Sequence, residues 1–372
     1  MKKILLISFE YPTGKSYCGG VGQIVKQCRN ALLELGCETY VLISSEFRKK
    51  HPVKLLLPDG SLKRYPDFWA FQKHYDWHKF NCIIQHFVNW TKELSKLKNH
   101  RGARPRILYH FHSILRREKD SGFKTLNQFL LNQEKMIEVA ERIICPSRYE
   151  YDNFIRYFPY FSEKATLIEN TLELFPRQEE EIRNIKSRHG IKDNDIVSVY
   201  VGRLERIKGA DIIIKNAPRV LKRHKNLKIF IIGKTLERNL YKRLSRVQKR
   251  FSRRVFYLKY LNKRLLFQYY YLSHIYVNTS LSESFSLTTH ESAFCNNALL
   301  LNSLPVFDKF KGAAMFFSNH RDSGNDFVSK YRKLIRDRQL RNRLSGKSAK
   351  IAKDFLAKNR LKEDFARLFK IF

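Results

Sequence analysis

The feature that most constrains the fold is a repeated alternation of short apolar runs with amphipathic segments. The apolar runs have the length of buried strands, and the amphipathic segments carry apolar residues at the i, i+3, i+4 and i+7 spacing of helices. Strands separated by helices form parallel sheets with right-handed crossovers. The pattern therefore predicts an α/β protein. The expected strands span residues 3–8, 39–43, 82–85, 106–109, 142–145, 165–168, 196–201, 228–232, 255–258, 275–278 and 298–301.

The alternation occurs twice along the chain. An acidic stretch without a strand pattern, residues 177–195, separates the two series and is expected to be a hinge. At roughly 100–200 residues per domain, 372 residues provide two domains. We expect a first domain at residues 1–176, a second at 177–350, and a C-terminal helix at 351–372 that packs back toward the first. Both domains are predicted to be doubly wound, Rossmann-like parallel sheets that face a central cleft, where ligands of such sheets bind.

The chain is also strongly basic. Its 72 lysines and arginines against 35 acidic residues give a formal charge of +37 at pH 7, which favours polyanionic partners. The sequence has no RRM, KH or zinc-finger pattern, so we expect no specific nucleic acid partner.

No apolar stretch approaches the ~20 residues that cross a bilayer. Six cysteines without a C-x-x-C pair favour the cytoplasm, and the charge predicts peripheral association with the inner face of the plasma membrane.

A basic pair follows the first strand of the second domain. Arg203 and Lys208 are bracketed by Gly202 and Gly209. A guanidinium and an ammonium group at a strand end suit the oxygens of a diphosphate. Gly209 lets the next helix begin close to such a ligand. The alternative interpretation is that both side chains form surface salt bridges.

Two glutamates, Glu283 and Glu291, lie eight positions apart on either side of a loop that leads into a helix. Backbone N–H groups of residues 285–288 would point at an anion at the N-terminus of this helix. Carboxylates accept hydrogen bonds from sugar and ribose hydroxyls, so the segment suits a nucleotide-sugar. An ordinary capped helix start is the alternative.

Together and in this order, the two segments resemble the donor site of retaining GT-B glycosyltransferases of family 4 (glycosyl transferases group 1). In that family, a stretch with Arg and Lys precedes an E-x7-E pattern, and this chain has both. The resemblance extends to the glycine loop and strand ends of the first half, at Gly19–Val21, Ile83–His86, Tyr109–Ser113 with Arg116 and Lys119, Ile144–Ser147 and Leu167–Asn170. It implies a GT-B fold and transfer of a sugar from a nucleotide-sugar with retention of configuration.

The resemblance also implies roles for the matching residues. Arg203 and Lys208 would bind the donor diphosphate, with ribose hydroxyls on Glu291 and hydroxyls of the transferred sugar on Glu283. Catalytic roles fall on His112, Glu283, Arg203 and Lys208, with His112 beside the reacting carbon. Donor-binding roles fall on Gly19, Gly20, Arg203, Lys208, Glu283, Phe285, Ser286, Leu287, Thr288 and Glu291. Acceptor-side roles fall on His86, Arg116 and Lys119.

The acceptor implied is a glycan or a lipid-linked glycan, as in the biosynthesis of cell-surface polysaccharide or lipopolysaccharide. Further acceptor contacts are expected from variable loops at residues 47–79 and 113–124.

We expect no cofactor and no metal ion, because the basic pair and the helix N-terminus would neutralise the leaving diphosphate. His110 and His112 are expected on opposite faces of their strand, unable to share an ion.

The chain departs from the family at Ser284 and Ser286, where glycines are usual, and around Asn297. Two other classes of function stay open: a nucleotide-sugar epimerase or phosphorylase on the same fold, and a non-catalytic basic protein that binds polyanions.

Overall fold

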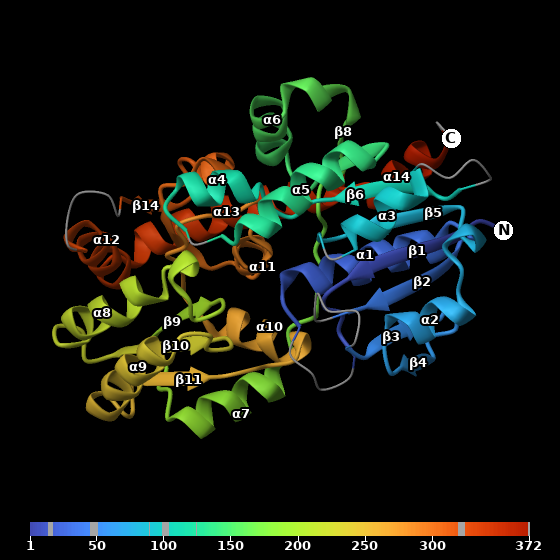
Figure 1. Cartoon of the computed structure of the whole chain (residues 1–372). Coiled ribbons are helices and arrows are strands. Elements are labelled where there is room, and N and C mark those ends of the chain that lie inside the picture. Colours follow the sequence, from blue (N-terminus) through green and yellow to red (C-terminus); the bar gives the residue numbers. More distant parts are fainter. Residues whose placement is uncertain are drawn as a thin grey trace. The chain divides into compact units, whose positions relative to one another are not determined.

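The computed structural model of this chain describes residues 1–13, 18–44, 51–88, 90–98, 104–123, 125–318 and 324–370. The chain divides into two compact units (Figure 1). Unit 1 comprises Met1–Thr171 and Asn359–Phe372, and unit 2 comprises Leu172–Lys358. Each unit has its own sheet and its own apolar core.

The described residues of unit 1 form an eight-stranded sheet in the order β4-β3-β2-β1-β5-β6-β7-β8. Six neighbouring strands of this sheet run parallel, as the alternation predicts: β2, β1, β5, β6, β7 and β8. Its strands are β1 (Lys3–Ser8), β2 (Glu38–Ile43), β3 (Val53–Leu56), β4 (Leu62–Tyr65), β5 (Cys82–Gln85), β6 (Arg106–His110), β7 (Arg142–Cys145) and β8 (Ala165–Leu167).

One edge of this sheet differs from the prediction. Strands β3 and β4 pair antiparallel as a hairpin, in a region assigned from the sequence to variable loops. The connecting turn is held by Asp59, whose carboxylate accepts hydrogen bonds from the backbone and hydroxyl of Ser61, and by Gly60 at φ +88°. A Pro-Asp-Gly turn between two short apolar runs is a hairpin signal that was overlooked.

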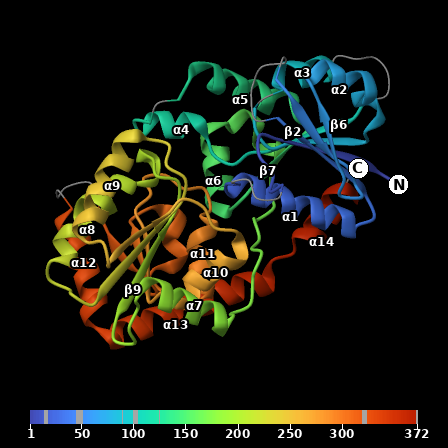
Figure 2. The same ribbon diagram turned by 90° about the horizontal axis from the view of Figure 1, so that it is seen from below.

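Helices cover both faces of the unit 1 sheet. Helix α1 contacts β1 and β2, and α14 packs against α1, as Figure 2 shows. Lys362 of α14 forms an ion pair with Glu34 at the end of α1. The helices are α1 (Gly20–Glu34), α2 (Phe68–His74), α3 (Thr91–Lys98), α4 (Leu115–Asp120), α5 (Asn127–Val139), α6 (Arg148–Tyr157) and α14 (Leu361–Lys370), with 3-10 helices η1 (Trp77–Lys79) and η2 (Pro159–Lys164).

The described residues of unit 2 form a six-stranded parallel sheet in the order β11-β10-β9-β12-β13-β14. Five of these strands were expected, and the short edge strand β14 was not. The strands are β9 (Ile196–Val201), β10 (Leu227–Ile232), β11 (Val255–Leu258), β12 (Ile275–Asn278), β13 (Ala298–Asn302) and β14 (Met315–Phe317). The two units confirm the predicted pair of doubly wound, Rossmann-like sheets.

The stretch assigned to a hinge, residues 177–195, is instead mostly helix α7 of unit 2. It packs on α10, and His189 lies 3.2 Å from the Tyr269 hydroxyl. The helices of unit 2 are α7 (Glu179–His189), α8 (Ala210–Leu221), α9 (Arg238–Arg250), α10 (Lys263–Leu272), α11 (Leu287–Phe294), α12 (Asn325–Arg336) and α13 (Arg338–Lys358), with 3-10 helices η3 (Arg206–Lys208) and η4 (Pro305–Phe310). Within the described ranges, no helix is long and apolar enough to cross a membrane.

Candidate functional site

In unit 2, the loop after β9 is pressed against the residues that follow β12, because these two strands are neighbours in the sheet. Gly209 makes this approach possible. Its φ is +61°, and a Cβ atom there would lie 1.8 Å from the carbonyl oxygen of Thr279. The Thr279 hydroxyl donates a hydrogen bond of 2.7 Å to the Gly209 carbonyl. A glycine is therefore required where the loop meets the start of α8.

The same approach brings two of the predicted site residues together. Lys208 Nζ lies 3.0 Å from Glu283 Oε1, and their side chains are 25% and 10% exposed. The Ser280 hydroxyl donates a 2.7 Å hydrogen bond to the same carboxylate oxygen. The Tyr200 hydroxyl donates to the Lys208 carbonyl at 3.0 Å, which fixes the backbone of the loop. Lys208 and Glu283 thus form a partly exposed, oriented charge pair.

Arg203 lies two residues beyond the end of β9. Its guanidinium forms an ion pair of 2.8 Å with Glu205, and its side chain is 43% exposed. The sequence prediction had no partner for Arg203, and Glu205 is that partner. The pair lies near the surface, where it is weak enough for a stronger anion to compete with it.

The loop before α11 is strained at one position. Ser286 adopts φ +65°, a conformation that costs a non-glycine residue about 1–3 kcal/mol. Its hydroxyl lies 3.2 Å from Asn278 Nδ2 and 2.8 Å from the Thr289 hydroxyl. These buried hydrogen bonds hold the serine where glycine is usual in the family. Phe285 does not line an open loop, because its ring is buried and stacks on His290 at 4.3 Å.

Leu287 and Thr288 are the first residues of α11. Backbone N–H groups in the first turn of a helix have no acceptor within the helix, and they carry its partial positive charge. The Thr288 hydroxyl lies 2.7 Å from that of Tyr276 on β12, which ties this turn to the sheet. The helix start therefore has the polarity of an anion site, and binding of the donor there stays a prediction.

Glu291 is 1% exposed and sits one turn into α11. One of its oxygens is paired with Lys263, and the other accepts a hydrogen bond of 3.3 Å from the Tyr270 hydroxyl. Both oxygens are therefore already engaged by α10. Lys263 was missed from the sequence. It follows the N-cap residue Asn262, which marks the start of α10 and places Lys263 in the first turn.

In unit 1, the glycine loop ends at α1. Both oxygens of Glu10 accept backbone hydrogen bonds there, from Gly19 at 2.9 Å and from Gly22 at 3.0 Å. A Cβ atom at Gly19 would lie 2.8 Å from the Glu10 carboxylate. Gly20 is the first residue of the helix. An internal carboxylate thus occupies the amide of Gly19, which the resemblance assigns to phosphate, and no sequence pattern indicated this contact.

Two histidines of the prediction lie together in unit 1. His86 Nδ1 is 3.2 Å from His112 Nε2, and the two rings stack at 5.5 Å. His86 is fully buried, and burial together with His112 lowers its pKa well below the ordinary value. Burial also lowers the pKa of His112. Both rings are therefore neutral near pH 7, one donating and the other accepting the shared proton.

The expectation that His110 and His112 lie on opposite faces is wrong. Their rings stack with centroids 4.9 Å apart. Residues two apart in an extended chain point to the same side, so the periodicity itself should have placed the pair together. The rings of His110 and His86 also lie close together, tilted by 42° with centroids 4.9 Å apart. The ends of β5 and β6 therefore carry a cluster of three histidines.

The acceptor-side residues do not form one cluster. His86 is buried, whereas Arg116 and Lys119 are exposed on α4. Lys119 donates a hydrogen bond of 3.2 Å to Asn127 at the start of α5. Arg117, which lies between Arg116 and Lys119 in the sequence, points inward, and its guanidinium lies 2.7 Å from the carboxylate of the buried Glu150. The loops expected to contact the acceptor lie partly outside the described residues.

Two family models match this chain, one over most of each unit. Residues 18–174 match the model of Glycosyltransferase Family 4, and residues 181–351 match that of Glycosyl transferases group 1. A search of curated proteins found no match.

Three solved structures share the fold at low sequence identity. Sucrose-phosphate synthase from Thermosynechococcus elongatus has a TM-score of 0.78 at 15% identity, over 100% of this chain and 98% of that one. The HepE protein of Anabaena, in complex with UDP-glucose, has a TM-score of 0.72 at 17% identity over 100% of both chains. The catalytic domain of starch synthase IV from Arabidopsis thaliana, bound to ADP and acarbose, has a TM-score of 0.65 at 11% identity, over 96% and 99%.

The two sheets and these likenesses define a protein of the GT-B fold. With a family 4 domain over most of unit 1 and a group 1 domain over most of unit 2, the chain belongs to the GT-B glycosyltransferases.

Proposed function

We propose that this glycosyltransferase uses a nucleoside-diphosphate sugar as donor, bound by unit 2, and transfers the sugar with retention of configuration. The observation that carries the proposal is the charge pair of Lys208 and Glu283, in the loops that follow β9 and β12. Arg203 belongs to the same short loop as Lys208, and the backbone carbonyls of both residues lie within hydrogen-bond distance of the Tyr200 hydroxyl. A cationic pair next to an oriented carboxylate suits a molecule with a diphosphate and a hydroxyl-bearing sugar.

The proposed roles of these residues follow from where charge develops when the bond between the sugar and the diphosphate breaks. Breaking a glycosyl–phosphate bond leaves negative charge on the departing diphosphate and positive character on the anomeric carbon. Arg203, Lys208 and the first turn of α11 supply fixed positive potential for the leaving group, typically worth ~3–4 kcal/mol for each well-placed donor. Glu283 would then exchange its contact with Lys208 for hydroxyls of the transferred sugar.

The engaged side chains determine how the donor would bind. A diphosphate at Arg203 has to displace Glu205, and a ribose at Glu291 has to share a carboxylate already held by Lys263 and Tyr270. We assign Lys263 to the ribose side of the donor together with Glu291, because the two form one charge pair. The role of His112 beside the reacting carbon and the acceptor-side roles of His86, Arg116 and Lys119 stay predictions from the resemblance.

The acceptor we propose is a glycan or lipid-linked glycan of a cell-surface polysaccharide, handled at an anionic membrane surface. Support for this part comes from the net charge and from the exposed basic face of α9. The test of the function is a thermal-shift panel of UDP-, GDP- and ADP-sugars on the full chain. Stabilisation by one nucleotide series is expected. Equal melting temperatures with and without every nucleotide-sugar would remove the proposal.

A further inference from the structure

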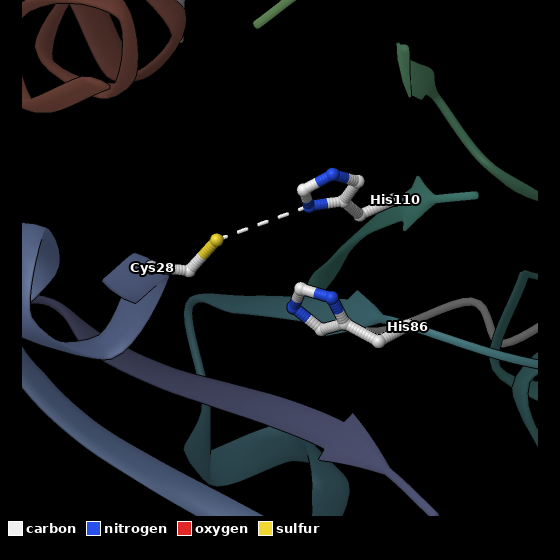
Figure 3. A group of neighbouring side chains, drawn as sticks. All are labelled: Cys28, His86 and His110. Carbon is white, nitrogen blue, oxygen red and sulfur yellow. Dashed lines mark hydrogen bonds between the residues drawn. The ribbon is translucent and has the colours of Figure 1, made fainter. Parts of the chain in front are cut away.

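A second group of side chains lies in unit 1, inside the face of the sheet that α1 covers. Cys28 comes from α1, His86 follows β5, and His110 ends β6, and Figure 3 shows the three converging. One ligand atom from each residue lies within 4.8 Å of the others. Cys28 Sγ lies 3.9 Å from His110 Nδ1.

The cluster is closed to solvent and incompletely satisfied. Cys28 and His86 are 0% exposed and His110 is 1% exposed. In the described part of the chain, Nε2 of His86 and Nε2 of His110 find no hydrogen-bond partner although both are buried. Buried imidazole nitrogens are normally hydrogen-bonded or bound to a metal. The unpartnered Nε2 of His86, close to the Cys28 thiol and to Nδ1 of His110, therefore calls for a ligand.

The donor set selects the kind of ligand. One thiol and two imidazoles are ligands of zinc, with bonds of about 2.3 Å to sulfur and about 2.0–2.1 Å to nitrogen. In a tetrahedral site with such bonds, ligand atoms lie about 3.3–3.6 Å apart. The separations in the cluster, 3.9 Å for Cys28 Sγ to His110 Nδ1 and at most 4.8 Å for the other pairs, exceed this by no more than about 1.5 Å. Small side-chain rotations would close the site.

The surrounding contacts also fit a coordinated ion. A metal-binding histidine usually donates its second ring N–H to a neighbour, which fixes its orientation. If His86 binds through Nε2, its Nδ1–H donates to His112 Nε2, 3.2 Å away. If His110 binds through Nδ1, which lies 3.9 Å from Cys28 Sγ, its Nε2–H is left for the side chain of Asn170, a hydrogen-bonding neighbour of this ring.

We propose that Cys28, His86 and His110 bind one zinc-class divalent cation inside unit 1. The two imidazoles coordinate as neutral rings. The thiol gives up its proton, so each ion bound releases one proton and the site gains a single net positive charge. Three protein ligands leave the fourth position of a tetrahedral ion to a water molecule. The bound ion orients His86, and through it the ring of His112.

The site departs from our expectation of no metal ion, for a reason visible in the chain. Cys28 lies on a helix and the histidines on two different strand ends, so no ligand spacing of a zinc motif appears in the sequence.

Cobalt titration tests the proposal, because Co²⁺ replaces zinc and reports a thiolate ligand by its near-ultraviolet charge-transfer absorption. The full chain is freed of metal with EDTA, titrated with Co²⁺, and then challenged with Zn²⁺. We expect the thiolate absorption to saturate at one equivalent per chain, with tetrahedral d–d bands, and to vanish when Zn²⁺ is added. Absence of a thiolate band with the wild-type chain overturns the proposal.

Two variants locate the ion. Cys28→Ser should lose the charge-transfer absorption, whereas Cys37→Ser, a partly exposed cysteine of the same unit, should keep it. A band of undiminished intensity in folded Cys28→Ser would place the metal elsewhere and refute the site. Circular dichroism of each metal-free variant checks folding. If Cys28→Ser does not fold, His86→Asn replaces it, and there a weakened Co²⁺ affinity is expected and an unchanged affinity refutes the site.

Discussion

Lys208 Nζ lies 3.0 Å from Glu283 Oε1, although the two residues belong to loops after different strands. The pair exists because β9 and β12 are neighbours in the unit 2 sheet and because Gly209 allows the loops to touch. A cation that already has a carboxylate partner is oriented before any ligand arrives. The pair therefore links the packing of the sheet to the proposed binding of the donor.

Replacement of Gly209 tests this link between packing and site. Gly209→Ala adds a Cβ atom 1.8 Å from the Thr279 carbonyl oxygen and forces alanine into a left-handed conformation. We expect a loss of at least about 2–3 kcal/mol in the free energy of unfolding, measured by urea titration. Gly190→Ala is the matched control, because Gly190 has a similar φ of +58° and open space around its Cβ position. Equal losses in the two variants would contradict the close approach of the loops.

Substitution of Arg203 is expected to lower kcat more than it lowers the free energy of unfolding. Arg203→Ala removes a donor from the developing negative charge of the leaving group, so kcat should fall by about 10²–10³-fold. Arg203→Lys should recover only part of the loss, because an ammonium cannot form the two parallel hydrogen bonds of a guanidinium. The exposed Arg223 of the same unit provides the control Arg223→Ala. Full activity of Arg203→Ala with the donor found in the thermal-shift panel would contradict the assignment.

The buried pair of Arg117 and Glu150 predicts a pH dependence of stability. Burial raises the pKa of Glu150 from 4.5 to about 7, against the opposing effect of Arg117. Between about pH 4.5 and pH 7 the folded chain holds a proton that the unfolded chain has released. This bound proton stabilises the folded chain fully below about pH 4.5, and the stabilisation is lost as the pH rises through about 7.

The measurement compares the wild type with Glu150→Gln by urea unfolding across this range. The free energy of unfolding of the wild type should fall relative to the variant by about 1–3 kcal/mol. Glu141→Gln, an exposed position of the same unit, should leave the pH profile unchanged. Parallel profiles for the wild type and Glu150→Gln would show that Glu150 titrates normally.

The basic face of α9 predicts binding to anionic membranes. Arg238, Lys242, Arg243, Arg246, Lys249 and Arg250 are all exposed on this helix. Lys and Arg near an anionic lipid surface contribute about 1 kcal/mol each. Ala substitution of Lys242, Arg246 and Lys249 together should therefore weaken sedimentation with anionic vesicles by about 10–100-fold at low salt. The same change at Lys347, Lys350 and Lys353 of α13 is the control. Equal losses in the two triple variants would leave only a nonspecific effect of net charge.

The alternation of strands and helices was readable from the sequence because buried parallel strands are continuous apolar runs. The hairpin of β3 and β4 was missed because each strand has only four residues and β4 is half polar, and β14 was missed because it has only three residues. The supposed hinge was misjudged from its acidic composition. Its charged residues cover the outer side of α7, while Ile182 and Ile185 are buried.

For the site, the sequence indicated which side chains lie at strand ends but not which charges they meet. Glu283 and Lys208 could be placed on adjacent loops by motif order alone. The partners Glu205, Lys263 and Glu10 could not, because each forms its contact through the folding of a loop or of another helix. The cluster around Cys28 escaped notice for the same reason.

The central claim is that Lys208 and Arg203 bind the diphosphate of the donor. Calorimetric titration with the nucleoside diphosphate selected by the thermal-shift panel tests it most directly. The Kd should rise by about 10–100-fold in Lys208→Ala, since a hydrogen bond to a charged group contributes about 1.5–3 kcal/mol, and should stay unchanged in Lys225→Ala, an exposed lysine of the same unit. An unaltered Kd in Lys208→Ala and in Arg203→Ala would contradict the account.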